Sequence, residues 1–224
     1  MPTHYGALSY DLSHLLGTAV LILSFGLLYQ RRTKAVVTTY ALQAVALAAA
    51  AAWQGYVQGA PQLYATAVIT LAAKGVVIPI AMLKLIERLN IQRSVEPALG
   101  IFMSMVLGVG LVALAILVVL PVTFQDSNLT REDLALALSV VLLGQLVMIS
   151  RRLALTQVIG FMSLENGLIL AAVSVAGMPL VVELSVAVLI LVAFVVFGIF
   201  FFRIRARFDS LDIGHFDRIS SMHR

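Results

Sequence analysis

Two residues with ionisable side chains, Lys74 and Glu165, lie near the middle of long apolar runs of this sequence. The run "VIGFMSLENGLILAAVSV", residues 158–175, places Glu165 directly beside the amide of Asn166. A charge at the centre of a bilayer costs about 2.5–3.5 kcal/mol on an insertion scale, so such residues face a bundle interior, a partner or water. An acid and a base at this depth are typical of proton handling. We therefore expect Glu165 and Lys74 to be relay residues.

Amides extend this candidate relay. Gln157, Phe161 and Glu165 follow one another at intervals of four residues, so we expect them to share one face of a helix. That row predicts a path for a proton from the side of Gln157 to mid-membrane. Gln43 and Asn166 are further candidates within spans, and Glu183 is a weaker one because it lies near a span's outer end.

Structural roles for the same residues remain open alternatives. Lys74 and Glu165 could pair simply to lock two helices together, and Gln43 and Gln145 could form interhelical hydrogen bonds. Pro79 lies five residues after Lys74. Because proline removes a backbone hydrogen bond, we expect it to kink the helix beside that charge.

The elements that carry these residues are membrane-spanning helices. The chain has 224 residues, of which 61% are hydrophobic and 12% charged, whereas soluble domains carry about 25% charged residues. A span needs about 20 mainly apolar residues. Seven runs qualify: 8–29, 35–58, 62–84, 98–122, 133–150, 153–177 and 179–202. The sequence thus predicts an all-α polytopic membrane protein with seven transmembrane helices.

Lysine and arginine in short loops predict the orientation, because they concentrate on the cytoplasmic side. With the N-terminus outside and the C-terminus inside, thirteen basic residues fall on the inner side and only Arg131 on the outer. The thirteen are Arg31, Arg32, Lys34, Lys84, Arg88, Arg93, Arg151, Arg152, Arg203, Arg205, Arg207, Arg218 and Arg224. In a membrane protein this basic balance does not indicate a nucleic-acid partner.

Several chemistries are excluded. The chain has no cysteine, which rules out disulfides and thiolate ligation of zinc or iron–sulfur clusters. Its four histidines lie outside the centres of the spans, and no HExxH, GxSxG or Walker motif occurs. We expect no catalytic residue, metal site or cofactor in this chain.

The segments "SRRLALTQVIGFMSLENG", "AAKGVVIPIAM" and "FFRIRARFDSLDIGHF" resemble hydrogenase-4 component E, over nearly the whole chain. The C-terminal half of that family is similar to the K subunit of bacterial complex I. In that comparison Glu165 lies about one turn from the K subunit's intramembrane glutamate, and Asn166 matches an asparagine. The second buried glutamate is replaced by Ala193, and Lys74 is a candidate to supply the missing charge.

The resemblance implies a non-catalytic membrane-arm subunit of an oxidoreductase complex that couples redox chemistry to proton or cation translocation. It implies partners: antiporter-like and quinone-site-type membrane subunits, and a cytoplasmic redox arm that holds the iron–sulfur clusters and the metal centre. The expected location is the cell inner (cytoplasmic) membrane. The expected divisions are a four-helix part (1–130), a three-helix part resembling the K subunit (131–202) and a basic cytoplasmic tail (203–224). A stand-alone ion transporter or channel, and a purely structural scaffold, are the alternatives.

The tail divides into two kinds of sequence. Arg203, Arg205 and Arg207 favour contact with anionic lipid. The following stretch, "FDSLDIGHFDRI", mixes acidic and apolar residues, which indicates docking on a protein partner. The residues that we expect to dock are Phe208, Asp209, Leu211, Asp212 and Phe216.

Overall fold

The structure is a computed structural model that describes residues 4–88, 100–122 and 128–174. No β-strand forms within these ranges. The helices are α1 (His4–Tyr29), α2 (Thr33–Gln58), α3 (Pro61–Thr70), the π-helix η1 (Leu71–Val77), α4 (Ile78–Arg88), α5 (Ile101–Val122), α6 (Asn128–Ser150) and α7 (Ala154–Ser174).

Six helical segments of the described chain are long and apolar enough to cross a membrane. One of them, Pro61–Arg88, consists of α3, η1 and α4 in succession. The protein is therefore an all-helical, multi-pass membrane protein, as its composition predicts. The seventh predicted span, 179–202, lies outside the described residues, so the seven-helix count and the orientation stay predictions.

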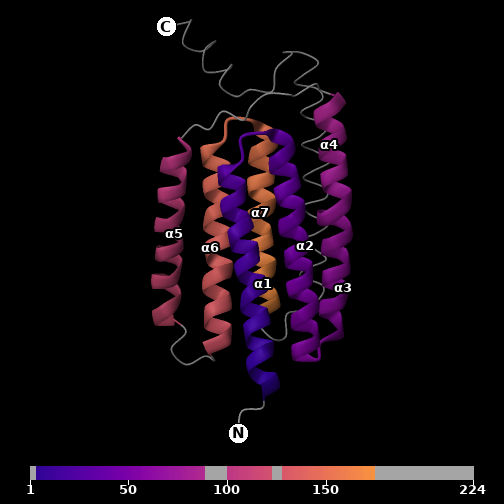
Figure 1. The fold of residues 1–224 in the computed structure, drawn as a ribbon, viewed down its shortest axis with the longest axis vertical. Helices are drawn as coiled ribbons and strands as arrows, with labels where there is room; N and C mark the ends of the chain where they lie inside the picture. The colour runs from indigo at the N-terminus through magenta and orange to yellow at the C-terminus, as the bar shows by residue number, and fades with distance from the viewer. Residues whose placement is uncertain (1–3, 89–99, 123–127, 175–224) are drawn as a thin grey trace, which may run out of the picture.

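The helices run side by side as one bundle (Figure 1). α7 packs on α6 and α2, while α5 lies at the edge and packs mainly on α6. One core cluster unites Leu28 of α1 and Tyr40 of α2 with Leu143 of α6 and Met162 of α7. The described helices of the predicted parts 1–130 and 131–202 thus share a hydrophobic core.

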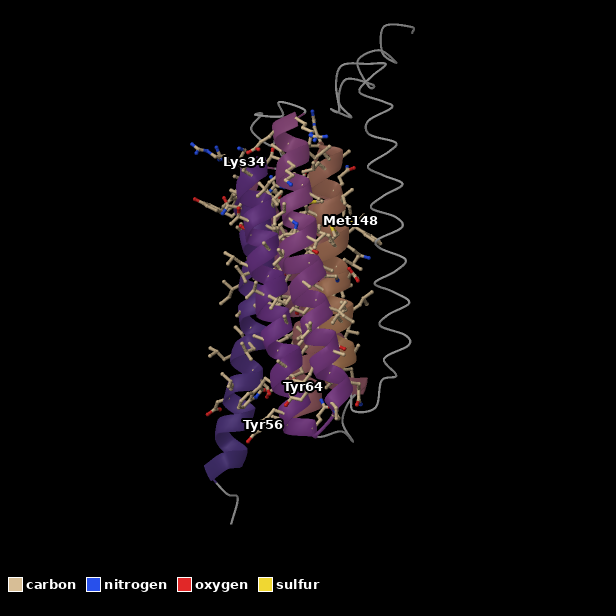
Figure 2. The ribbon with its side chains drawn as sticks, turned by 90° about the vertical axis from the view of Figure 1, so that its right-hand side faces the viewer. Lys34, Tyr56, Tyr64 and Met148 are labelled. Atoms are coloured by element: carbon tan, nitrogen blue, oxygen red, sulfur yellow. The ribbon has the colours of Figure 1, made fainter. Side chains whose placement is uncertain are left out.

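The two ends of the bundle differ in charge. Lys34 lies at one end, and Tyr56 and Tyr64 lie at the other (Figure 2). The α1–α2 turn, the last turn of α4 and the α6–α7 turn all lie at the first end (Figure 1). We call it the basic end, because these segments carry Arg31, Arg32, Lys34, Lys84, Arg88, Arg151 and Arg152.

A glycine and a proline form the α2–α3 turn at the opposite end. Gly59 ends α2 in the left-handed conformation, with φ 62°, and glycine adopts this region without strain. Pro61 then opens α3 at its first turn, where its missing N–H is not needed. This turn reverses the chain, so that the third span returns toward the basic end and carries Lys74 back into the bundle.

Small residues allow α6 and α7 to approach closely. A Cβ atom added at Gly144 of α6 would lie 2.5 Å from the backbone nitrogen of Leu164 of α7. Gly160 and Gly167 of α7 face the backbone of α6 in the same way, at Met148 and Val141. Close packing through small residues is common between membrane helices. Because Leu164 precedes Glu165, this contact also sets the depth and rotation of the buried acid.

Candidate functional site

Lys74 and Glu165 form a buried ion pair. The Nζ atom of Lys74, on η1, lies 2.5 Å from Oε2 of Glu165, on α7. The two side chains are 5% and 3% exposed. The structure therefore brings the predicted acid and base together in the bundle interior. In such a low-dielectric setting the attraction is strong, and loss of one partner would leave an uncompensated charge.

Two predicted amides continue from this pair. Lys74 Nζ also donates to Oδ1 of Asn166 at 3.1 Å. Asn166 Nδ2 in turn donates to Oε1 of Gln43 on α2 at 3.2 Å. Four of the predicted relay residues are thus linked through atoms within hydrogen-bonding distance, across three separate spans.

Two serines complete this network. Gln43 Nε2 donates to Ser24 Oγ on α1 at 2.7 Å and to Ser163 Oγ on α7 at 3.0 Å. The Ser24 hydroxyl donates to the carbonyl of Val20 at 2.9 Å. Neither serine could be selected from the sequence, because isolated serines are common in membrane helices and carry no distinctive spacing. Gln43 forms the expected interhelical hydrogen bonds, and it does so inside the same network.

A π-helix places Lys74. The N–H of Ile78, which follows η1, donates to the carbonyl of Ala73, five residues back. The next residue, Pro79, has no N–H, so it can donate neither to the Gly75 carbonyl in an α register nor to the Lys74 carbonyl in a π register. π-helical turns widen a helix locally and occur frequently at functional sites. The sequence predicted a proline kink here, and the structure places a wider helical segment before the proline.

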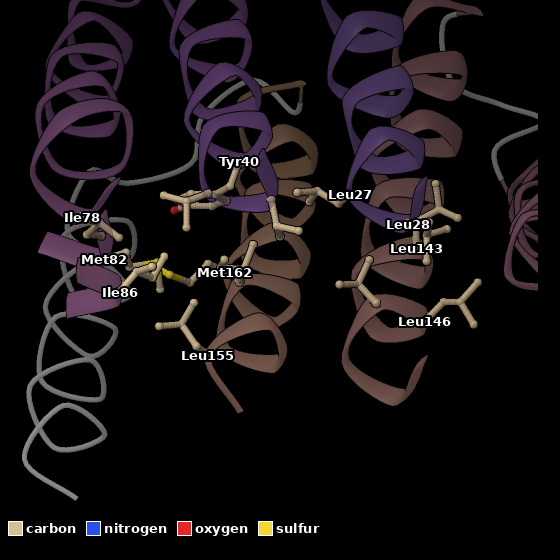
Figure 3. Packing of buried hydrophobic residues seen from close by; sticks show 14 residues of the cluster. Leu27, Leu28, Tyr40, Ile78, Met82, Ile86, Leu143, Leu146, Leu155 and Met162 are labelled. Atoms are coloured by element: carbon tan, nitrogen blue, oxygen red, sulfur yellow. The ribbon is translucent and has the colours of Figure 1, made fainter. Parts of the chain in front are cut away.

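Two apolar clusters separate this polar network from the ends of the bundle. The first, toward the basic end, contains Leu28, Val36, Ile86 and Leu155 among others (Figure 3). The second, toward the opposite end, includes Ala50, Leu63, Ala137 and Val173. The ion pair therefore lies in an apolar surrounding on both sides, which strengthens its electrostatics.

The remaining predicted relay residues lie elsewhere. Gln157 Nε2 donates to the backbone carbonyl of Arg151 at 2.9 Å, in the α6–α7 turn. Phe161, between Gln157 and Glu165 in the expected row, is 41% exposed, so that row is not a continuous buried path. Glu183 lies outside the described residues, as do the docking residues Phe208, Asp209, Leu211, Asp212 and Phe216. Gln145 is exposed.

The sequence places Arg151 in a loop, and the structure buries its charge. It is 2% exposed, and its Nη2 atom donates to the carbonyls of Leu27 at 2.8 Å and Leu28 at 2.6 Å. These carbonyls end α1, where backbone acceptors have no intrahelical donor. Desolvation lowers the pKa of Arg151 from its usual value. Arg151 therefore ties the α6–α7 turn to the end of α1.

Further polar contacts lie toward the opposite end of the bundle. Gln54 Nε2 donates to Oδ2 of Asp133 at 3.3 Å, and His14 Nδ1 lies 3.7 Å from Oε2 of Glu132. The described residues contain no group of three or more His, Asp or Glu side chains that could hold a metal ion.

Comparison with known proteins shows a relative that matches most of the chain. No family model and no solved structure matches the chain. The chain is 30% identical over 189 residues to the uncharacterized protein Rv0085 of Mycobacterium tuberculosis (strain ATCC 25618 / H37Rv), a match that covers 84% of this chain and 86% of that protein. Over most of both lengths, then, the two sequences correspond, and this chain belongs to the same protein family as Rv0085.

Proposed function

We propose that this protein is a membrane-arm subunit of a hydrogenase-4/complex I-related complex, in which Glu165 binds and releases a proton beside Lys74. The observation that carries the proposal is the ion pair between the two side chains at mid-span. The resemblance to component E supports the assignment to a redox-coupled complex. Location in the cytoplasmic membrane, with the basic end inside, is part of the same proposal.

The physical basis is the balance of two opposing effects on each charge. Desolvation favours the neutral forms of a buried carboxyl and a buried amine, whereas their mutual attraction favours the charged forms. A neighbouring charge that appears or disappears shifts this balance. Protonation of Glu165 then removes the attraction that holds Lys74, and the same change reaches Gln43 because Asn166 bonds both Lys74 and Gln43.

The test is Glu165→Gln, which keeps the shape of the side chain and removes its titration. Glu87→Gln is the matched control, because Glu87 also pairs with a lysine, Lys34 at 3.0 Å, but at an exposed position. Purified complexes are reconstituted in vesicles, and proton uptake per electron transferred is measured. Because the amide oxygen of glutamine can still accept a hydrogen bond from the Lys74 ammonium, we expect normal assembly of both variants and impaired proton movement only in Glu165→Gln. Normal coupling in a fully assembled Glu165→Gln complex would exclude the relay role.

A structural lock is the second candidate function for the same residues. Buried ion pairs often contribute no net stability, yet removal of one partner is strongly destabilising. A lock predicts that Glu165→Gln lowers assembly and leaves the coupling of the assembled fraction unchanged. Co-purification separates both readings from a stand-alone transporter, because a subunit is isolated with other membrane proteins and a cluster-bearing redox arm.

A further inference from the structure

Tyr40 of α2 carries a buried hydroxyl group that has no hydrogen-bond partner within the described part of the chain. Its side chain is 0% exposed, and among the described residues no group donates to or accepts from the hydroxyl. Buried polar groups normally have a partner, and an unpartnered one in a native structure calls for an explanation. Phenylalanine would fill the same apolar site without this cost, so packing alone does not explain the oxygen.

The hydroxyl lies within the electrostatic reach of Glu165. Tyr40 also precedes Gln43 by three residues on the same helix, about one turn nearer the basic end. Figure 3 shows the hydroxyl oxygen on the side of the cluster where Ile78 and Met82 of α4 lie. Ile78 follows Lys74 by four residues in the span Pro61–Arg88, so the hydroxyl lies on the side of the span that carries the buried base.

Tyr40 is also the titratable member of the apolar cluster between the network and the basic end. The sequence predicted Gln157 for a step on this side, but Gln157 bonds the Arg151 carbonyl. A phenol both donates and accepts a hydrogen bond, so it can pass a proton on without a net change of its own charge.

We propose that Tyr40 is the proton-exchange residue of Glu165 on the side of the basic end. The proposal rests on the proposed function, because it requires that Glu165 titrates. In the transfer, a hydronium ion that arrives from the basic end gives a proton to the hydroxyl oxygen and becomes water, and the hydroxyl releases its own proton, through an intervening water molecule, to the Glu165 carboxylate. Tyrosine is unchanged after the step, one carboxylate becomes a carboxylic acid, and the Lys74 ammonium loses its counter-charge.

Several groups surround the acceptor in this step. Lys74 contacts Glu165 from η1, and Asn166 follows it on α7. Gln43 lies on the helix of Tyr40 and bonds Asn166. Lys74 is the only cation among these groups, so it sets the affinity of Glu165 for the proton. Tyr40 sets how fast the proton arrives, and the two roles are separable by experiment.

The experiment measures the rate at which Glu165 exchanges its proton. The full-length protein is reconstituted in lipid, and infrared difference spectra are recorded after a pH step in H2O and in D2O. The Glu165 carboxyl band is the one that Glu165→Gln abolishes. Tyr40→Phe removes only the hydroxyl oxygen, and Tyr64→Phe, at the opposite end of the bundle and 44% exposed, is the matched control.

We expect Tyr40→Phe to slow the appearance of the Glu165 band at least about tenfold, within the range of positioned proton-transfer groups, and Tyr64→Phe to leave it unchanged. The thermal unfolding temperature of Tyr40→Phe should equal or exceed that of the parent, because an unsatisfied hydroxyl is lost. Tyr40→His, which restores a ring that exchanges protons, should recover part of the rate.

Contrary outcomes separate this inference from the proposed function. An unchanged rate in Tyr40→Phe, with a Glu165 band that still responds to pH, overturns the role of Tyr40 and leaves the relay role of Glu165 standing. A Tyr40→His rate no faster than that of Tyr40→Phe also overturns it, because packing would then explain the slow exchange. A Glu165 band that is absent from the parent spectra overturns both.

Discussion

The ammonium group of Lys74 binds Glu165 and Asn166, two consecutive residues of α7, at 2.5 Å and 3.1 Å. One ammonium group therefore binds both the carboxylate of Glu165 and the amide of Asn166. Because Asn166 also donates to Gln43, any change in the charge of Glu165 is passed by hydrogen bonds to α2. Glu165 thus contacts the span of η1 directly, and it is linked to α2 through Asn166 and to α1 through Gln43.

The ion pair predicts non-additive effects on stability. Lys74→Met or Glu165→Leu alone should lower the free energy of unfolding by about 3–5 kcal/mol, because each leaves a buried charge without its partner. The double variant should recover much of this loss. Unfolding of the purified protein in detergent by a denaturant series measures all three values. Additive losses in the double variant would contradict a direct interaction.

The α6–α7 contact predicts a strong effect of one methyl group. In Gly144→Ala the new Cβ would lie 2.5 Å from the nitrogen and 2.7 Å from the Cα atom of Leu164. Because these are backbone atoms, the helices must separate, at a cost of about 1–3 kcal/mol for overpacking. Gly110→Ala is the control, since nothing lies within 4 Å of its added Cβ. Thermal unfolding of both variants tests this, and equal midpoints would refute the close contact.

The bonds of Arg151 to α1 predict a loss of stability at the basic end. Arg151→Gln shortens the side chain and removes the charged donor to the Leu27 and Leu28 carbonyls, so we expect a loss of about 1.5–3 kcal/mol. Arg152→Gln is the matched control, because Arg152 is exposed and surface changes remain within about 0.5 kcal/mol. Hydrogen exchange at the end of α1 should accelerate in the first variant alone. Equal exchange in both would show that the buried guanidinium does not hold α1.

The predicted orientation can be tested by labelling, because the chain contains no cysteine that would interfere. Pro61→Cys lies in the turn opposite the basic end, and Arg32→Cys lies in the α1–α2 turn; both positions are exposed. With the N-terminus outside, a membrane-impermeant maleimide added to intact cells should label Pro61→Cys. Arg32→Cys should react only after permeabilisation. The reverse pattern would invert the assigned orientation.

The placement of the spans could be predicted from the sequence, because a helix must be long and apolar throughout to cross a bilayer. Six of the predicted runs coincide with described helices, and the run 62–84 corresponds to α3, η1 and α4 within Pro61–Arg88. The π-helical register within that span could not be predicted. Its sequence signal, a glycine after Lys74 and a proline five residues after it, is equally compatible with a simple kink.

The candidate site could also be predicted only in part. Lys74, Glu165 and Asn166 could be selected from the sequence because their cost in lipid depends only on depth, and depth follows from position along a span. Which of these residues meet depends on how distant helices are rotated against one another. The sequence therefore favoured Gln157 as the step to Glu165, with an interhelical hydrogen bond as the alternative for Gln43, whereas the structure links Gln43 to Asn166 and directs Gln157 to the α6–α7 turn.

By itself, then, the sequence determined that this protein is helical and crosses a membrane several times, and that it carries an acid and a base at mid-depth. Those properties follow from composition and run length, which are local. Only the tertiary structure decided that the acid and base pair, that Ser24 and Ser163 bond Gln43, and that Arg151 and Tyr40 are buried. These relationships depend on which faces of separate helices pack together, and no local pattern of residues encodes that choice.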